Sequence, residues 1–382
     1  MATIEEQPER TLESRLRFTR EMMQGSIYRK YEKAMRKFWD PGEFDYEADA
    51  RDFQSLTPEQ QRGIVMITVR FLGGEQEVTD ETLPMIYAAH VLGKFDWTMF
   101  LSSFMMEEAR HSQFFAMWHE RVVGAVDVDE LREYWIDREK TVDPSGRYST
   151  GEPVYEGLPY FGHQLIDACH AGDLKAVEEG FVRFSTLYNI WVEGVLTMPS
   201  YEIVIDTCDI WGKLGTLRHG FKQIVADEGR HITFGTAACR ELIEKRPELE
   251  QVVHDAINLY RGNAVGMLEY QRFVPELDLQ KYQLQKVRHY KNRCRELNIT
   301  PDQTLIDDIL DTGQTLATVV QHLRTLGPRR IRTCVFLDNP ARRVHPVQAD
   351  FIGFRVPDVF VVGYGMDHAD RHRNLPFVGV LE

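Results

Sequence analysis

A duplicated acidic motif contains the residues of this sequence that are best suited to do chemistry. Each copy reads Glu-x-x-His, and a further glutamate lies about one helix-length before each copy. Residues three apart on a helix share one face, so each glutamate and its histidine can reach the same point. Four carboxylates and two imidazoles from four helices are the ligand set of a carboxylate-bridged two-metal site. The six residues are Glu75, Glu108 and His111 in the first half and Glu193, Glu228 and His231 in the second.

The surroundings of the motif favour metal binding over a solvated helix face. A single Glu-x-x-His is a weak signal, but the first copy lies between the apolar runs Phe104–Met106 and Phe114–Trp118. Buried carboxylates are costly unless they bind a metal or are paired. Carboxylate and imidazole ligands without thiolates suit iron or manganese and argue against structural zinc. Arg110 and Arg230 occupy matched positions in the two copies, and we expect them to be outward-facing ion-pair partners rather than catalysts.

The elements that must position these residues are helices. Apolar residues recur at three- and four-residue spacing from Leu12 to about Leu297, which predicts a mainly α-helical bundle. Thr57 and Pro58 predict the cap and first residue of one helix, and the turn-rich Asp143–Pro153 predicts a loop between the two halves. The clearest helical segments are Leu16–Trp39, Pro58–Phe71, Thr82–Val122, Lys175–Leu196, Lys213–Glu244 and Leu249–Phe273.

The sequence changes character at residues 298–301, where a second domain is expected to begin. Short runs of β-branched and aromatic residues then predict strands, and Thr315–Leu326 predicts a helix between the first two of them. Strand, helix and strand in this order predict a small α/β domain. We therefore predict two domains, residues 1–299 and 300–382. The expected strands are Thr304–Leu310, Ile331–Leu337, Phe360–Tyr364 and Phe377–Leu381.

The overall composition excludes several classes of partner. The 382 residues are 43% hydrophobic and carry a net charge of −14, which argues against binding to nucleic acid or to an anionic membrane. No apolar run is long enough to span a bilayer, and the polar, acidic Met1–Arg10 is unlike a signal peptide. Five dispersed cysteines favour a reducing cytoplasm and buried free thiols over a disulfide framework.

Residues 12–297 resemble the ferritin-like superfamily, on the branch of the ribonucleotide reductase small subunit. Within that branch they are most similar to the small-subunit-like ligand-binding oxidases. The first ligand is Glu75 rather than aspartate, and Phe115 stands where many reductase subunits keep a radical tyrosine. The runs Gly73–Val78 and Tyr188–Glu193 also match the oxidase pattern. The resemblance implies a ferritin-like bundle that forms a homodimer, or a higher oligomer.

The resemblance also implies the metals and the ligand. It implies manganese in the first half and iron in the second, with Glu108 and Glu228 as candidate bridges; the sequence alone does not choose between manganese/iron and di-iron. It further implies that the protein activates O2 for two-electron C–H oxidation. The implied second ligand is a long-chain fatty-acid-like molecule bound to the metals through its carboxylate.

An ether bond between Val78 and Tyr188 is implied as a self-modification. Val78, three residues after Glu75, lies on the metal-facing side of its helix, and its tertiary C–H is a plausible target for oxidation. Tyr188 lies five residues before Glu193, which is roughly 140° away on a regular helix. A π-type distortion is therefore expected in this segment if Tyr188 is to reach the metals.

Residues 304–382 resemble hypoxanthine-guanine phosphoribosyltransferases. In the matching run Thr304–Thr315, a strand ends in carboxylates and a small-residue turn opens a helix whose N–H groups hold a phosphate. Gln348 replaces the purine-reading lysine of that family, and the first half of the enzyme is absent. We therefore expect no phosphoribosyl transfer by this chain alone, but binding of a purine nucleotide or phosphoribosyl pyrophosphate, or a role in assembly. The residues implied to contact nucleotide are Asp307, Asp308, Asp311, Thr312, Gly313, Gln314, Thr315, Gln348, Phe360, Val361, Asp367 and Arg373.

Three alternatives remain open from the sequence. The chain could be a ribonucleotide reductase small subunit that holds a one-electron oxidant for a large subunit. A ferritin-like metal store is a second alternative, although the added domain argues against assembly of a cage. A nucleotide-sensing or scaffolding protein with an auxiliary metal site is the third.

Overall fold

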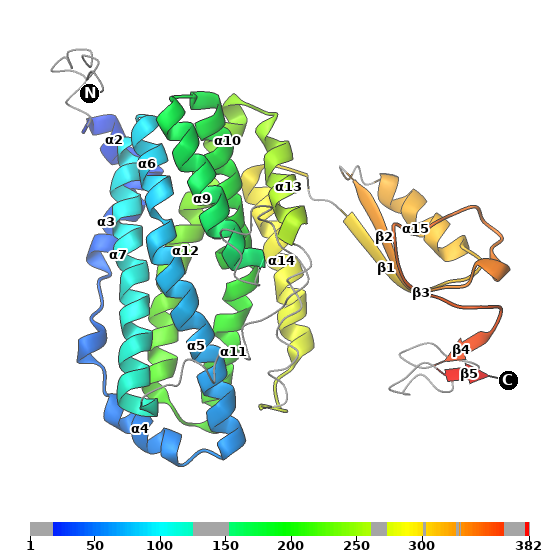
Figure 1. Cartoon of the computed structure of the whole chain (residues 1–382), viewed down its shortest axis with the longest axis horizontal. Coiled ribbons are helices and arrows are strands. Elements are labelled where there is room, and N and C mark those ends of the chain that lie inside the picture. The colour runs from blue at the N-terminus through cyan, green and yellow to red at the C-terminus, as the bar shows by residue number, and fades with distance from the viewer. Residues whose placement is uncertain are drawn as a thin grey trace, which may run out of the picture. The chain divides into compact units, whose positions relative to one another are not determined.

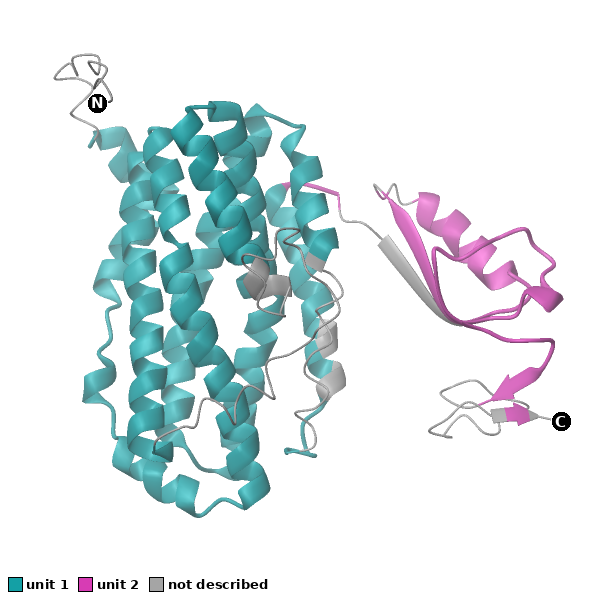
Figure 2. Cartoon of the chain, in the orientation of Figure 1, with its two compact units in different colours: residues 1–297 teal, residues 298–382 magenta. Residues whose placement is uncertain are grey.

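The chain forms two compact units, Met1–Leu297 and Asn298–Glu382 (Figure 2). The structure is a computed structural model that describes residues 18–124, 153–260, 273–300, 303–325, 328, 330–362 and 379–381. The N-terminal segment Met1–Arg10 and nearly all of the expected loop at 143–153 lie outside the described residues.

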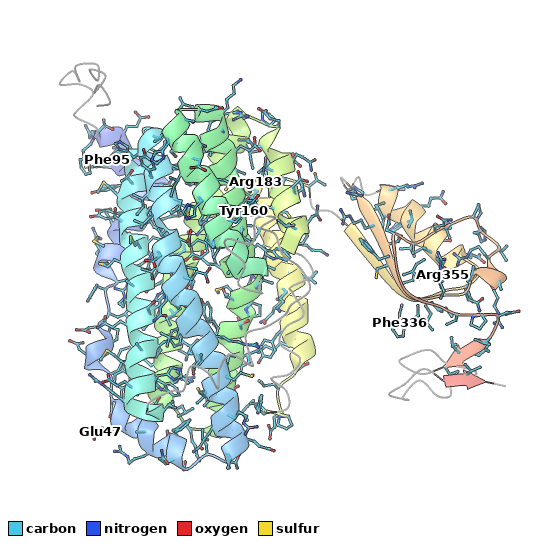
Figure 3. The ribbon with its side chains drawn as sticks, in the orientation of Figure 1. Glu47, Phe95, Tyr160, Arg183, Phe336 and Arg355 are labelled. Atoms are coloured by element: carbon cyan, nitrogen blue, oxygen red, sulfur yellow. The ribbon has the colours of Figure 1, made fainter. Side chains whose placement is uncertain are left out.

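The first unit is a bundle of long helices (Figure 1). Side chains fill the space between the helices (Figure 3). None of the helices in the described part of the chain is long and apolar enough to cross a membrane. The described helical elements are α2 Arg20–Gln24, α3 Ser26–Arg36, η1 Pro41–Glu43, α4 Tyr46–Gln54, α5 Pro58–Glu81, α6 Leu83–Val91, α7 Phe95–Trp118, η2 His119–Val123, α9 Pro153–Ala171, α10 Leu174–Ser185, η3 Thr186–Thr197, α11 Met198–Trp211, α12 Gly215–Lys245, α13 Leu249–Tyr260 and α14 Leu279–Leu297.

The helix boundaries differ from the predicted segments where glycine changes the backbone. The predicted helix Leu16–Trp39 is interrupted at Gly25, which is extended. The predicted helix Thr82–Val122 is two helices, because Gly93 between them has a left-handed φ of 71°. The helix predicted over Pro58–Phe71 begins at Pro58 as expected but continues to Glu81. Extra length on that helix is what carries Glu75 into the bundle.

Two capping arrangements fix the helices that carry the motif. At the start of α5, Thr57 accepts a hydrogen bond from the backbone of Gln60, whose side chain accepts one from the Thr57 backbone. At the start of α12, the carboxylate of Asp49 on α4 accepts from the backbone N–H groups of Thr216 and Leu217, at 2.9 and 2.8 Å. Asp49 also accepts from the Trp118 indole at the end of α7. One buried carboxylate thus joins α4, α7 and α12.

The second unit is built on a short parallel sheet with the order β1-β2-β3. Leu316 of α15 packs against Leu310 and Val335, so the helix covers one face of the sheet. Phe336 extends from β2 on the opposite side and is 37% exposed (Figure 3). The elements are β1 Gln303–Leu310, α15 Gln314–Thr325, β2 Ile331–Asp338, η6 Pro340–Arg342, β3 Phe351–Arg355 and the antiparallel pair β4 Phe360–Val362 with β5 Gly379–Leu381.

Two expectations need correction here. The sequence did not predict β3, because its side chains are largely exposed and show no alternation of apolar and polar residues. All five cysteines are free thiols, as expected, but Cys334 is only half-buried and the other four are buried.

Candidate metal centre

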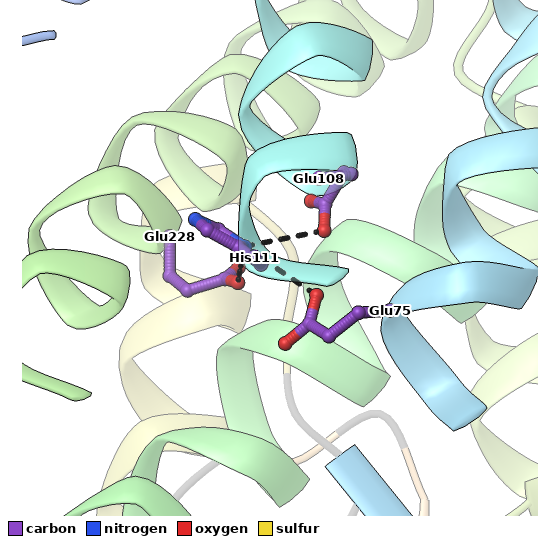
Figure 4. A group of neighbouring side chains, drawn as sticks. All are labelled: Glu75, Glu108, His111 and Glu228. Atoms are coloured by element: carbon purple, nitrogen blue, oxygen red, sulfur yellow. Dashed lines mark ion pairs between the residues drawn. The ribbon is translucent and has the colours of Figure 1, made fainter. Parts of the chain in front are cut away.

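The structure brings all six residues of the duplicated motif together inside the bundle. Each is 4% exposed or less. One group contains Glu75, Glu108, His111 and Glu228, and their ligand atoms lie within 4.8 Å of one another (Figure 4). A second group, with the same spacing limit, contains Glu108, Glu193, Glu228 and His231. Glu108 and Glu228 belong to both groups, which is where bridging carboxylates would have to lie.

Four elements supply these side chains. Helix α5 supplies Glu75, and the π-helical η3 supplies Glu193. Helices α7 and α12 each supply one Glu-x-x-His pair. Helix α5 packs against α7, and α12 packs against η3. Contacts between α7 and α12 bring the two halves together.

The two imidazoles face the carboxylates through the same nitrogen atom. The Nδ1 atom of His111 lies 3.4 Å from Glu75, 3.5 Å from Glu108 and 3.6 Å from Glu228. The Nδ1 atom of His231 lies 2.9 Å from Glu108, 3.4 Å from Glu228 and 3.5 Å from Glu193. Each histidine Nδ1 therefore faces one carboxylate that belongs to a single group and two carboxylates that belong to both groups.

The hydrogen-bonding state of these atoms suits divalent cations. Both Nδ1 atoms and one oxygen each of Glu108, Glu193 and Glu228 are buried without a hydrogen-bond partner among the described residues. Leaving buried polar atoms unsatisfied is costly, whereas a metal ion would accept all of these lone pairs. Burial also raises the pKa of the Glu75 carboxyl well above its usual range. The donor set, with four carboxylates and two imidazoles, therefore fits two metal ions.

Two carboxylates behind the histidines set their orientation. Nε2 of His231 lies 2.9 Å from Glu107, and Nε2 of His111 lies 3.2 Å from Asp227. A carboxylate only accepts hydrogen bonds, so each Nε2 donates its proton to one, and Nδ1 is the nitrogen left to ligate a metal. Burial alone would raise the pKa of Asp227, but His111, Trp39 and Arg230 hold it well below its usual range.

The expectation that Arg110 and Arg230 face outward is wrong, although they are ion-pair partners. Both are 4% exposed. Arg230 donates to Glu107 and to Asp227, and Arg110 donates to Asp227 at 3.0 Å. Because α7 and α12 present these four residues to each other, two positive and two negative charges neutralise one another inside the bundle.

Sequence reasoning missed three further side chains that hold this centre. Trp39 donates to Asp227 at 2.8 Å, and Tyr201 donates to Glu228 at 3.2 Å. Asn189 donates to Glu193 at 3.1 Å from one helical turn earlier. Asn189 could have been found from the sequence, because a polar amide within the apolar run before Glu193 suggests a hydrogen-bonding role. Trp39 and Tyr201 are too far from their partners along the chain for the sequence to reveal these contacts.

The structure buries both Val78 and Tyr188 in the core. Val78 is 6% exposed on α5, and Tyr188 is 1% exposed on η3. The π-type segment that Tyr188 was expected to need is present over Thr186–Thr197. The ring of Phe104 stacks on Tyr188 with centroids 5.6 Å apart and lies 3.8 Å from that of His231. Burial, with the charges of Glu108 and other central glutamates, raises the pKa of Tyr188 well above its usual range.

The position that many reductase subunits use for a radical is apolar here. Phe115 is fully buried and stacks on Phe71 with ring centroids 5.8 Å apart. Phe114 and Phe221 contact the same ring.

The residues expected to contact a nucleotide divide into three groups. Five line the turn into α15, where Gly313 has a φ of 80° and Thr312 donates its backbone N–H to Asp311. In β4, Phe360 is 38% exposed while Val361 is buried. Gln348, which precedes β3, is exposed. Asp307 and Asp308 lie on β1, but their side chains are outside the described part of the structure, as are Asp367 and Arg373 entirely.

Sequence reasoning also missed the residue that fixes this turn. The Arg343 guanidinium donates to the backbone carbonyls of Leu310, Asp311 and Val347 at 2.9–3.0 Å and pairs with Asp338. It thereby ties the end of β1 to the end of β2.

A helical bundle with two carboxylate-rich, histidine-containing groups at its centre defines a protein of the ferritin-like, dinuclear-metal class. The family model for "Ribonucleotide reductase, small chain" matches residues 19–260. The chain belongs to the ribonucleotide reductase small-chain family, as the resemblance of its motifs implied.

Solved structures of an R2-like ligand-binding oxidase share the fold of the first unit. One, with an aerobically reconstituted Mn/Fe cofactor, is 24% identical with a TM-score of 0.60, and the match covers 72% of this chain and 93% of that chain. A variant of that oxidase with an aerobically reconstituted Fe/Fe cofactor is 24% identical, with a TM-score of 0.60, over 72% of this chain and 94% of that chain. At this level of identity the likeness establishes the fold.

The C-terminal part matches a different family. The model for "Phosphoribosyl transferase domain" matches residues 285–369. The hypoxanthine-guanine phosphoribosyltransferase of Bacillus subtilis (strain 168) is 48% identical over 81 residues, which are 21% of this chain and 45% of that protein. The chain thus spans about half the length of this relative.

Proposed function

We propose that the helical unit is an oxidoreductase that activates O2 at a dinuclear manganese/iron or di-iron centre. The observation that carries this proposal is the pair of four-residue groups, whose buried Nδ1 and carboxylate atoms have no hydrogen-bond partner among the described residues. Glu75, Glu108 and His111 would hold one ion, and Glu193, Glu228 and His231 would hold the other. When bound, such a pair of ions supplies the electrons and the binding site for dioxygen.

The chain's own residues orient the ions, exclude water and place the target of oxidation. The aromatic shell of Phe104, Phe114 and Phe115 is fully buried and keeps bulk water from the centre. Glu107 and Asp227 hold the two imidazoles in the tautomer that ligates metal. A long-chain fatty-acid-like ligand is part of this proposal, supported by the apolar surroundings and by the name of the related oxidases.

The proposed self-modification joins Val78 to Tyr188. The ether forms as the tertiary C–H bond of Val78 and the O–H bond of Tyr188 are lost, and two electrons and two protons pass to dioxygen. Tyr188 is suited to this because its hydroxyl has no hydrogen-bond partner in the described structure and lies in a π-helical segment. Val78 is on the same helix as the ligand Glu75, one turn later.

Peptide masses test the oxidase assignment. Metal-free protein is loaded anaerobically with manganese and iron, exposed to air and digested. We expect a Val78-containing peptide joined to a Tyr188-containing peptide, lighter by two hydrogens than their sum. The Tyr188→Phe variant, treated identically, should bind both metals and show no joined peptide. Separate, unmodified peptides from wild type with both metals bound would instead favour a radical-storing or metal-binding role.

A ribonucleotide reductase small subunit is the alternative, favoured by the family match over residues 19–260. Phe115, fully buried among aromatic rings, argues against a radical tyrosine at that position. The five free thiols support a reducing compartment, and we propose a cytoplasmic homodimer, which size measurement in solution would distinguish from a cage.

For the C-terminal domain, which we place at residues 300–382, we propose nucleotide binding or assembly rather than catalysis. The chain spans 45% of its phosphoribosyltransferase relative, and the three-stranded sheet has α15 on one face. With phosphoribosyl pyrophosphate and guanine or hypoxanthine, we expect no pyrophosphate release above that of buffer. The full-length enzyme from Bacillus subtilis serves as the positive control, and turnover by the present chain would refute the expectation.

A further inference from the structure

The ligands of the two halves do not distinguish two different metals. Each half has one glutamate that belongs to a single group, one shared glutamate on the helix of its histidine, and one histidine whose Nδ1 faces the carboxylates. Two chemically equal ligand sets would bind manganese and iron in either order. A centre that holds two different ions in fixed positions therefore needs a difference in the layer around the ligands.

In that layer, Tyr201 and Asn189 donate to the carboxylates of Glu228 and Glu193. The partners of the two histidines belong to a charged quartet, defined as Glu107, Arg110, Asp227 and Arg230, which connects the halves crosswise. Glu107, one residue before the shared Glu108 on α7, accepts from His231 on α12 at 2.9 Å. Asp227, one residue before the shared glutamate of α12, accepts from His111 on α7 at 3.2 Å. Each helix thus orients the histidine of the other helix.

The quartet is not symmetric. Asp227 accepts hydrogen bonds from Trp39 at 2.8 Å, from Arg110 at 3.0 Å and from Arg230, in addition to the one from His111. Glu107 accepts from Arg230 and His231, while Arg110 lies 3.6 Å from it, beyond hydrogen-bond distance. A carboxylate whose charge is shared among more donors is the weaker acceptor for each, which agrees with the longer contact from Asp227 to His111.

We propose that Glu107 is a positioning residue that makes the His231 half the stronger electron donor and so assigns iron to it. Asp227, with its charge spread over more donors, leaves the His111 half to manganese. Polarisation of Nε2–H by a carboxylate increases the basicity of Nδ1. Divalent iron binds nitrogen and oxygen ligands more tightly than manganese, so the half with the stronger donor gains more from iron. This inference rests on the proposed mixed-metal function.

Site-resolved metal occupancy tests the inference. The metal-free full chain is given limiting, equimolar iron and manganese without oxygen, and anomalous diffraction at the two absorption edges assigns each ion. In wild type we expect iron to be enriched in the His231 half. Glu107→Gln should lower the iron-to-manganese ratio there about tenfold, at the low end of the effects of lost outer partners. Asp227→Asn, the matched carboxylate-to-amide change, should leave the ratio in that half unchanged.

A third variant is expected to shift iron toward the other half, and it leaves the four charges of the quartet in place. Trp39→Phe removes one donor from Asp227, which makes Asp227 a stronger acceptor for His111, and we expect more iron in the His111 half. The inference is overturned if Glu107→Gln and Asp227→Asn shift the metals equally, or if Trp39→Phe leaves the His111 half unchanged while two ions are bound.

The outcome is separable from that of the oxidase proposal. Wild-type protein that binds the two metals in the expected order but forms no joined peptide would refute the oxidase and leave the role of Glu107 standing. Joined peptides from protein in which both halves hold the same ratio of metals would support the oxidase and refute the role of Glu107.

Discussion

Replacement of Glu108 by alanine is expected to remove both metal ions, whereas replacement of Glu75 should remove one. Glu108 belongs to both four-residue groups, and its two oxygens face different histidines, at 3.5 Å from His111 and 2.9 Å from His231. Glu75 belongs to one group only. We expect the affinity of both positions to fall by more than about 100-fold in Glu108→Ala, beyond the effect of a lost outer partner.

The measurement is metal content after loading with excess iron and manganese and removal of unbound ions. Wild type should hold two ions per chain, Glu75→Ala one and Glu108→Ala essentially none. The two variants are matched, because each deletes one buried glutamate of the same bundle. Each substitution removes one buried side chain, Glu75 at 4% and Glu108 at 1% exposed, and circular dichroism of the metal-free proteins is the control that both variants are folded. Equal metal loss in both variants would contradict a shared role for Glu108.

The second large effect concerns stability. Arg230→Met should lower the free energy of unfolding by about 3–5 kcal/mol, which is typical when one partner of a buried ion pair is removed. Arg230 is buried, and its guanidinium donates to Glu107 and Asp227. Without it, Arg110 is left as the single cation of the charged quartet to compensate two buried carboxylates.

Denaturant unfolding of the metal-free protein, followed by tryptophan fluorescence, is the measurement. All six tryptophans precede residue 298, so the signal reports on the helical unit alone. Arg218→Met is the control, because the Arg218–Asp209 pair lies at the surface and is screened by solvent, so its loss should cost far less than the loss of Arg230. If the two variants unfold at the same denaturant concentration, the charged quartet does not stabilise the bundle.

Local patterns in the sequence were sufficient to predict the ligand set and most of the helices and strands. The duplicated Glu-x-x-His pairs and their upstream glutamates identified six side chains that the structure brings together. Apolar periodicity located α5, α7 and α12, because a helix that buries one face must repeat it every three to four residues. In the second unit, Thr304–Leu310 and Ile331–Leu337 coincide closely with β1 and β2, which pair in parallel.

Long-range packing decided the rest. The contact between Glu107 and His231 joins residues 124 positions apart, and neither residue type reveals it. The burial of Arg110 and Arg230 depends on the approach of α7 to α12, which places two guanidinium groups against two carboxylates. A charged side chain on a helix is normally solvated, so no local pattern predicts this.

The sequence by itself determined which atoms are available to hold metal, because residue type and helical spacing are local properties. Only the tertiary structure decided how those atoms are oriented. The π-helical backbone of Thr186–Thr197, the hydrogen bonds from Trp39 and Tyr201, and the unequal surroundings of the two histidines all arise where elements distant in sequence meet. Packing of one element against another sets these contacts, and no spacing along a single helix records them.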